Sequence, residues 1–341
     1  MTDLAAAASP TAARALTPRR GPLFDGSSPG LREGHRGEKL FEYGTAGAAW
    51  LVLALLAGVA VSMVWGGRLA FKTFGLHFLT SSDWDAVAGR FGALVPIYGT
   101  IMSSAIALVI AVPVSIGIAL FLTDIAPRWM RGPVGIAIEL LAAIPSIIYG
   151  MWGLFVFAPF LAAHVEPWVN EHLGQWPILG PLFTGPPIGI GLLPAGIVLG
   201  IMIIPFIAAV ARDVFNAVPA GLREAAVSLG ATRWEMLSRV TLPYTRSAVI
   251  GAIFLGLGRA LGETMAVTFV IGNSHDLTAS LLMPGNSIAA ALANEFTEAD
   301  TDLYRSSLIA LAFLLFVVTF IILSIAKLML LRVERISGRT N

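Results

Sequence analysis

Residues 217–243 read AVPAGLREAAVSLGATRWEMLSRVTLP, a charged stretch that stands between two long apolar runs. Pro219 and Thr232 each precede a run of helix-forming residues, and Gly230 separates the two runs. The stretch therefore predicts two short helices joined at Gly230. Its arginines and glutamates are too costly to place in hydrocarbon, so we expect it to lie in water. A folded, charged loop of this kind is typical of a docking element.

The composition surrounding this loop is that of a polytopic membrane protein. Of the 341 residues 56% are hydrophobic and 13% charged, with a mean hydropathy of +0.80. The chain has no cysteine, which excludes disulfides, thiolate metal sites and a cysteine nucleophile. Its histidines show no metal-ligand spacing, so we predict no metal and no cofactor, and interpret them as solvated loop residues: His35, His77, His164, His172 and His275.

Six apolar segments are long enough to cross a bilayer, which needs about 20 helical residues. The sequence thus predicts an all-α protein with six transmembrane helices, at about 46–65, 94–122, 134–160, 188–210, 248–271 and 307–331. An even number of crossings places both termini on one side of the membrane. The third predicted helix contains Glu139, which we interpret as a structural hydrogen-bonding group near the expected cytoplasmic end of that helix. Prolines should kink the spans, namely Pro113, Pro145, Pro159, Pro194 and Pro205.

The distribution of basic residues predicts which side the termini occupy. If the N-terminus is cytoplasmic, 17 of the 22 Lys and Arg lie on the cytoplasmic side, whereas Arg259 lies inside a span. This rule places both termini and the loop around Glu224 in the cytoplasm. No apolar region follows Arg19-Arg20, so we expect neither a twin-arginine nor a cleavable export signal.

The same pattern divides the chain into four parts. We expect a flexible basic cytoplasmic tail over residues 1–42, and a first transmembrane helix with its outer loop over 43–93. A core of five helices should follow over 94–331, with a C-terminal cytoplasmic tail over 332–341.

The outer loops are expected to differ in character. Residues 66–93 and 163–187 carry aromatic residues or Pro and Gly, which favours ordered caps at the outer interface. Residues 273–302 become acidic towards their end and contain a short apolar piece, 288–293, that predicts a small interfacial or re-entrant helix. This last loop is either a docking surface for an external partner or an ordinary solvated loop.

Two charges stand near the middle of the fifth predicted span, GAIFLGLGRALGETMAVTFVIG (251–272). Arg259 and Glu263 are four residues apart, so on a continuous helix they share a face and can pair. A guanidinium in a narrow wet pathway suits a tetrahedral oxyanion, because its planar donors match two oxygens at once. The alternative is a structural ion pair between helices. Gly258 and Gly262 have the G-x-x-x-G spacing that allows another helix to approach closely.

The loop resembles a family motif. Glu224-Ala225-Ala226, Gly230 after three residues, and Val240-x-Leu242-Pro243 after nine more are similar to the EAA loop of bacterial ABC importer permeases. Only Val240 departs from that pattern, which has isoleucine there. The resemblance implies that this segment is the coupling helix that docks on an ATPase subunit. Alternatively, the loop is amphipathic and lies on the membrane surface.

A second pair of motifs makes the resemblance more specific. RALGETMAV (259–267) and AIPSIIYG (143–150) are similar to the PstC-type permease subunit of bacterial phosphate ABC importers, over about residues 94–331. This implies a type I ABC importer permease fold in the bacterial plasma membrane, with Arg259 and Glu263 involved in phosphate passage. The implied partners are a second permease (PstA type), an ATPase dimer (PstB type) and an external binding protein (PstS type), with no nucleic acid.

The sequence also indicates where ATP is hydrolysed. It contains no Walker A pattern G-x-x-x-x-G-K-[ST], so we expect a transport subunit that is not itself an enzyme. Three alternatives remain at this stage. They are a permease for another oxyanion (molybdate, sulfate or phosphonate), an ion-coupled secondary transporter in which Arg259 and Glu263 relay protons, and a non-transporting scaffold.

Overall fold

The computed structural model describes residues 31–177 and 179–336, with side chains described from Gly37 to Arg332. Two units are distinguished, one ending at Gly58 and one beginning at Val59. In this part of the chain the secondary structure is helical, with two isolated β-bridges and no strand. The prediction of six membrane-spanning helices is confirmed, with these bounds: Gly37–Gly66, Leu94–Ile125, Ser146–His172, Leu192–Asn216, Arg233–Leu261 and Asp302–Arg332.

The first unit consists of helix α1 (Leu31–Gly66) up to Gly58. This helix begins well before the expected tail boundary at 42, because residues 38–42 (EKLFE) are mostly good helix formers. Residues 31–42 are therefore helical and not a flexible tail, while the prediction for residues 1–30 lies outside the described residues. At the other end of the chain, α15 (Asp302–Ile336) continues past the expected boundary at 332.

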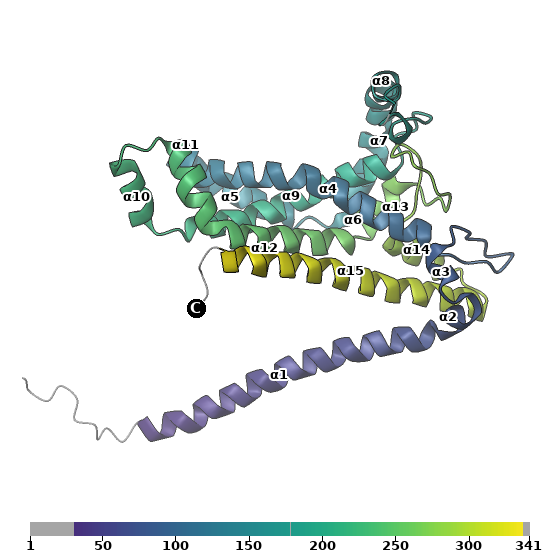
Figure 1. The fold of residues 1–341 in the computed structure, drawn as a ribbon, viewed down its shortest axis with the longest axis horizontal. Coiled ribbons are helices and arrows are strands. Elements are labelled where there is room, and N and C mark those ends of the chain that lie inside the picture. The colour runs from purple at the N-terminus through teal and green to yellow at the C-terminus, as the bar shows by residue number, and fades with distance from the viewer. Residues whose placement is uncertain (1–30, 178, 337–341) are drawn as a thin grey trace, which may run out of the picture. The chain divides into compact units, whose positions relative to one another are not determined.

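One end of the second unit is a cap of short helices (Figure 1), and buried aromatic residues pack between them. It contains α2 (Arg68–Phe74), α3 (His77–Thr80) and α14 (Ile288–Glu295). Phe78 and Leu308 are fully buried there, and the Ser306 hydroxyl donates to the Gly66 carbonyl at 2.8 Å. The short apolar piece at 288–293 does form a helix, and both it and the loop at 66–93 are ordered.

The centre of the second unit is the contact between α4 (Leu94–Leu120) and α9 (Leu192–Asn216). Small residues let the two backbones approach closely, as expected for helices that pack in a membrane. A Cβ added at Gly196 would lie 2.6 Å from the Ile106 side chain, so the site has no room for one. The π-helical turn η2 (Phe121–Ile125) continues α4 at its end.

The third span is placed differently from the prediction of 134–160. Helix α5 (Arg128–Ala142) is separate and ends before Pro145, and the span begins at Ser146. The reason is local, because proline lacks an N–H and disfavours helical geometry in the residue before it. The span then runs to His172 through α6 (Ser146–Trp152), η3 (Gly153–Phe157), α7 (Ala158–Phe160), η4 (Leu161–Val165) and α8 (Glu166–His172).

The fifth span also differs from its predicted bounds of 248–271. It begins at the charged loop, with α11 (Arg233–Met236) and the π-helical turn η6 (Leu237–Thr241), and continues as α12 (Leu242–Leu261). The helix ends at Gly262 and resumes as α13 (Met265–Ile271). Glycine is a poor helix former, which favours a break at this position.

The prolines do not all lie inside helices. Pro113 and Pro205 lie inside α4 and α9, whereas Pro194 lies in the first turn of α9. Pro145 precedes α6, and Pro159 lies in the short α7 between two π-helical turns. The remaining short helix between α8 and α9 is η5 (Gly180–Leu182).

Candidate functional site

The charged loop has the predicted form of two short helices. Helix α10 (Ala220–Ser228) begins after Pro219, and Gly230 has φ +88°, a conformation that favours glycine. Thr232 then starts α11 with a capping box, in which its hydroxyl accepts from the Glu235 amide and the Glu235 carboxylate accepts from the Thr232 amide. The joint at Gly230 is confirmed.

Helix α10 buries none of its residues. Glu224 and Ala225 are exposed, and Ala226 is half-buried. Large apolar side chains are exposed beside them, with Leu229 at 89% and Trp234 at 70% exposure. Large apolar side chains exposed on a charged loop are typical of a protein interaction surface.

The side chain of Arg223, unlike that of Glu224, contacts the transmembrane helices of the unit. One of its guanidinium nitrogens lies 2.9 Å from Asp124 Oδ1, and another donates to the Phe215 carbonyl. Asp124 lies at the end of the second span, with 8% of its side chain exposed. Arg223 is therefore an anchor, while Glu224, the next residue, remains available to a partner.

The end of the motif starts the helix that carries Arg259. Leu242 packs beside Phe215 and Val249, while Pro243 is exposed in the first turn of α12. Since η6 and α12 follow α11 without interruption, the loop is joined to Arg259 by continuous helical backbone.

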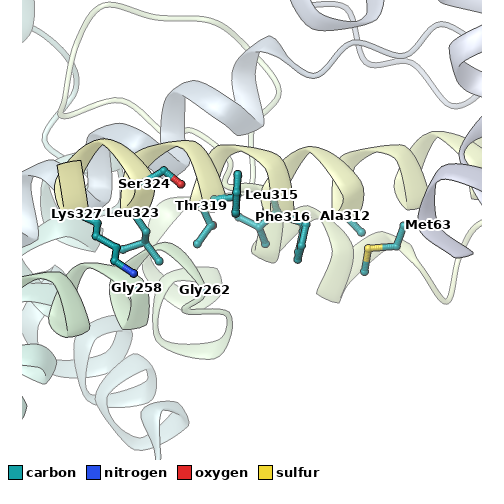
Figure 2. Close-up of a pocket in the computed structure, with 11 residues that line it drawn as sticks. Met63, Gly258, Gly262, Ala312, Leu315, Phe316, Thr319, Leu323, Ser324 and Lys327 are labelled. Carbon is teal, nitrogen blue, oxygen red and sulfur yellow. The ribbon is translucent and has the colours of Figure 1, made fainter. Parts of the chain in front are cut away.

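Arg259 lies in the last turn of α12 and is exposed. Its neighbour Gly258 lines a groove of about 550 Å³ together with α15, opposite Thr319 and Leu323 (Figure 2). Thr319 and Leu323 belong to the span Asp302–Arg332, whereas Arg259 lies near the end of the span Arg233–Leu261, just before the break that precedes α13, so its position at mid-depth stays a prediction. The G-x-x-x-G face, however, is open and not closely packed, because a Cβ at Gly258 would meet only Leu323 Cδ1 at 3.8 Å.

Arg259 and Glu263 do not form the predicted ion pair. Among the described residues no salt bridge involves either of them. Glu263 follows the end of α12, and its Oε1 accepts from the Ala266 amide at 3.2 Å, at the start of α13. The guanidinium of Arg259 instead lies over the Phe206 ring, 5.9 Å from its centroid. The prediction assumed one continuous helix, and the break at Gly262 removes the shared face.

Glu139 has the structural role that the sequence favoured. Its Oε1 accepts from Arg212 at 2.6 Å, and the same nitrogen lies 3.2 Å from Asp213 Oδ1. This ion pair joins α5 to the C-terminal half of α9, which leads into the charged loop. Because its partner is an internal arginine, Glu139 belongs to the framework of the unit.

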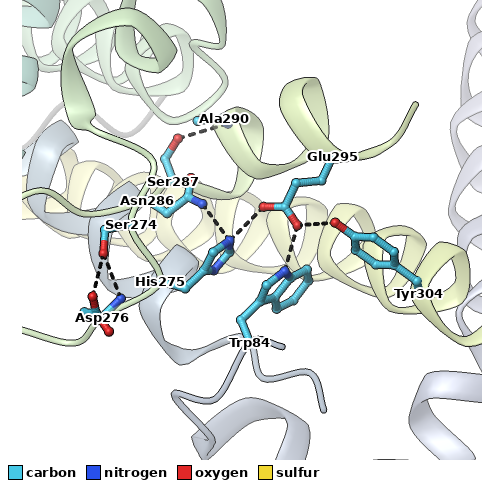
Figure 3. A network of polar contacts seen from close by, with 9 residues as sticks. All are labelled: Trp84, Ser274, His275, Asp276, Asn286, Ser287, Ala290, Glu295 and Tyr304. Atoms are coloured by element: carbon cyan, nitrogen blue, oxygen red, sulfur yellow. Dashed lines mark hydrogen bonds and ion pairs between the residues drawn. The ribbon is translucent and has the colours of Figure 1, made fainter. Parts of the chain in front are cut away.

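His275 corrects the interpretation of the histidines as solvated. Its side chain is 18% exposed, stacks on Trp84 with ring centroids 4.9 Å apart, and contacts Glu295 Oε1 through Nε2 at 2.7 Å (Figure 3). Trp84 Nε1 and the Tyr304 hydroxyl donate to the other carboxylate oxygen, at 2.7 and 2.8 Å. These four residues form what we call the outer network, after the side of the membrane on which the sequence predicts these loops. Sequence spacing could not reveal it, because its members come from three separate segments.

Glu295 is ionised within this network. Burial raises the pKa of its carboxyl, but the hydrogen bonds from His275, Tyr304 and Trp84 outweigh that effect and hold the pKa below its ordinary value. The other histidines described, His77, His164 and His172, lie on helices, and the side chain of His35 lies outside the described residues. In the described ranges no group of acidic residues and histidines is arranged to hold a metal ion.

Comparison with known proteins identifies the family. Residues 112–335 match the family described as "Binding-protein-dependent transport system inner membrane component". The chain belongs to this permease family. Two of its relatives in the family are the phosphate transport system permease proteins PstC of Xylella fastidiosa and Mesorhizobium japonicum. They are 57% and 55% identical to it, over 92% and 88% of this chain and 97% and 92% of theirs.

A solved structure agrees with the permease fold. A bacterial ABC transporter involved in the import of the acidic polysaccharide alginate aligns with a TM-score of 0.54 and 20% identity. The alignment covers 85% of this chain and 98% of that one. This permease is therefore a multi-pass inner-membrane component of a transport system and not an enzyme.

Proposed function

We propose that this permease translocates inorganic phosphate across the plasma membrane, driven by ATP that another subunit hydrolyses. The observation that carries the proposal is the close similarity to PstC proteins, whose name specifies phosphate transport. Arg259 supports it, since an exposed guanidinium inside a predicted span, which no carboxylate of the described residues neutralises, suits a tetrahedral oxyanion.

The mechanism follows from how the loop is joined to the pathway. The coupling surface comprises Glu224, Ala225, Ala226 and Gly230, and the motif ends at Leu242 and Pro243, where α12 begins. A partner that moves this loop moves α12 with it, and α12 carries Arg259. In our proposal, closure of the ATPase subunits rocks the spans in this way, so that the anion pathway opens to alternate sides. Glu263 contributes by fixing the start of α13.

The orientation that this requires places the loop in the cytoplasm. The positive-inside distribution of 17 of the 22 Lys and Arg supports cytoplasmic termini. The partners we propose are a PstA-type second permease, a PstB-type ATPase dimer and a PstS-type external phosphate-binding protein. The second permease would cover the exposed side of Arg259 and complete the pathway.

The substrate is tested by measuring phosphate uptake with Arg259→Ala. We expect uptake to fall by at least tenfold, because the anion loses its charged donor, while Lys72→Ala in the outer cap should be unaffected. Molybdate, sulfate and phosphonate should compete poorly with phosphate. Normal uptake by Arg259→Ala would remove Arg259 from the pathway, and strong competition by another oxyanion would change the substrate.

The coupling role is tested separately with Glu224→Ala. We expect the ATPase subunit to co-purify with the wild-type chain in mild detergent and to be lost with the variant, because an exposed carboxylate that binds a basic partner residue is removed. Glu298→Ala, an exposed carboxylate of the outer loop, is the matched control. Retention of the ATPase by Glu224→Ala would contradict the assignment.

A further inference from the structure

The guanidinium of Arg259 lies over an aromatic ring. Its guanidinium carbon lies over Phe206 of α9, 5.9 Å from the ring centroid, within the range of a cation–π contact. Tyr149 of α6 also lies within range of the Arg259 charge, but its hydroxyl donates to the Leu141 carbonyl at 2.9 Å. No carboxylate in the described part of the chain pairs with the guanidinium.

The type of contact matters for binding an anion. A guanidinium has five N–H donors, and all of them lie in its plane. A carboxylate partner would occupy two of these donors and cancel the charge, whereas a ring that contacts the face leaves every donor free. A neighbouring ring thus attracts the charge without competing with an oxyanion for its hydrogen bonds.

Phe206 is well suited to hold such a position. It packs, partly buried, against the central core cluster, and α9 contributes Met202 and Ile203 to that cluster on the preceding turn. The ring has only two side-chain torsions, so little conformational freedom remains once it is packed. By comparison, the carboxylate nearest in sequence, Glu263, is held at the start of α13 through the Ala266 amide.

We propose that Phe206 is a positioning residue that holds the Arg259 guanidinium by its face and leaves its edge free for phosphate. This rests on the proposed function, because it assigns a support to the same anion-binding group. Phe206 itself makes no contact with the anion. Its contribution is to keep a long, flexible side chain in one orientation, in a place where no acidic side chain does so.

The test is phosphate uptake by the full transport complex, measured as KM and maximal rate. Phe206→Leu keeps an apolar side chain but removes the ring, and we expect KM to rise by about 2- to 30-fold, the range of a cation–π contact converted to an equilibrium constant. The maximal rate should change much less. Phe206→Tyr and Phe206→Trp keep a ring and should restore a KM close to that of the wild type.

The matched control is Phe269→Leu in α13. Phe269 packs against the same core cluster and lies against the Gly150 backbone, but it makes no cation–π contact with Arg259. Its loss measures the effect of removing ring volume alone, so KM should stay near the wild-type value. The amount of complex recovered reports folding for each variant.

Three results would overturn the proposal. The first is a KM of Phe206→Leu equal to that of the wild type. The second and third are a rise in the KM of Phe206→Tyr, or of Phe269→Leu, as large as that of Phe206→Leu. Either of these would show that Phe206 acts by packing. Failure of the proposed function has a different signature, since Arg259→Ala would then transport phosphate normally. If Phe206→Leu took up phosphate with a wild-type KM while Arg259→Ala lost uptake, only the role of Phe206 would be overturned.

Discussion

The two ends of the larger unit satisfy their polar and apolar groups in opposite ways. At the inner loop, α10 buries no residue, and Leu229 and Trp234 remain exposed. At the outer end, Glu295 accepts three hydrogen bonds from within the chain, and the aromatic residues around it stack on one another (Figure 3). The carboxylate of Glu295 thus finds its partners within the chain, whereas α10 is held to the rest of the unit by the partly buried Arg223.

This difference assigns different roles to the carboxylates of Glu295 and Glu224. In the outer network the largely buried carboxylate of Glu295 joins Trp84, His275 and Tyr304, so its loss should lower the stability of the fold. On α10 the charge of Glu224 is exposed, and in our proposal it binds the ATPase subunit, so its loss should affect assembly. Substitutions at the two ends can therefore break or sharpen the comparison.

The largest effect on stability is expected at Glu295. Glu295→Ala leaves Trp84 Nε1, the Tyr304 hydroxyl and His275 Nε2 without their acceptor, and should destabilise the folded state by about 2–4 kcal/mol. Thermal unfolding of the purified complex measures this, with the exposed Glu298→Ala as control. Equal melting temperatures for the two variants would contradict a cohesive outer network.

Arg223→Ala should have the next largest effect. It leaves Asp124, which is largely buried, without its ion-pair partner and frees the Phe215 carbonyl, at a cost of about 1.5–3 kcal/mol. Increased proteolysis within residues 217–232 would report the loosened loop. Glu224→Ala, at the next residue, should leave proteolysis unchanged. Similar cleavage of both variants would contradict the claim that Arg223, and not Glu224, holds the loop in place.

Removal of the cap of α11 should cost about 1 kcal/mol. Thr232→Ala deletes the hydroxyl that accepts from the Glu235 amide. Hydrogen exchange of the amides of residues 233–236 should become faster, while that of α14 should not change. Thr232→Ser keeps the hydroxyl and should exchange like the wild type, so fast exchange in both variants would refute the capping contribution.

A smaller, graded effect is expected from pH at the outer end. Because the pKa of Glu295 is lower in the folded state than its ordinary value, the unfolded chain takes up this proton first as pH falls. The stabilisation is present above the ordinary glutamate pKa of about 4.3 and is lost below it. Melting temperatures from pH 6 to pH 3 should fall more steeply for the wild type than for Glu295→Gln, and parallel curves would contradict this.

The sequence predicted the features that depend on local pattern. Six spans, two short helices joined at Gly230 and an ordered cap follow from apolar length, capping residues and loop composition, and the structure has all three. Span boundaries failed where one residue interrupts an apolar run, at Pro145 and Gly262. Hydropathy does not register such breaks, because the residues on both sides remain apolar.

Contacts between distant segments were beyond this reasoning. The supposed pair of Arg259 and Glu263 came from their spacing alone, and neither Phe206 nor Trp84 had any local signal that linked it to Arg259 or to Glu295. The predicted position of Arg259 at mid-depth rests on span length alone and stays a prediction. Its partner depended on how α9 packs against α12, which sequence periodicity does not specify.

The interruption between α12 and α13 also limits what surrounds it. Where a helix stops and restarts inside a bilayer, amides and carbonyls lose their partners, and acyl chains cannot replace them. Glu263 satisfies one amide, that of Ala266, while Gly262 is exposed. The side of the larger unit at Gly262 is therefore unsuited to face lipid, and we expect it to face water or a neighbouring subunit, which limits how this unit can be rotated about the membrane normal.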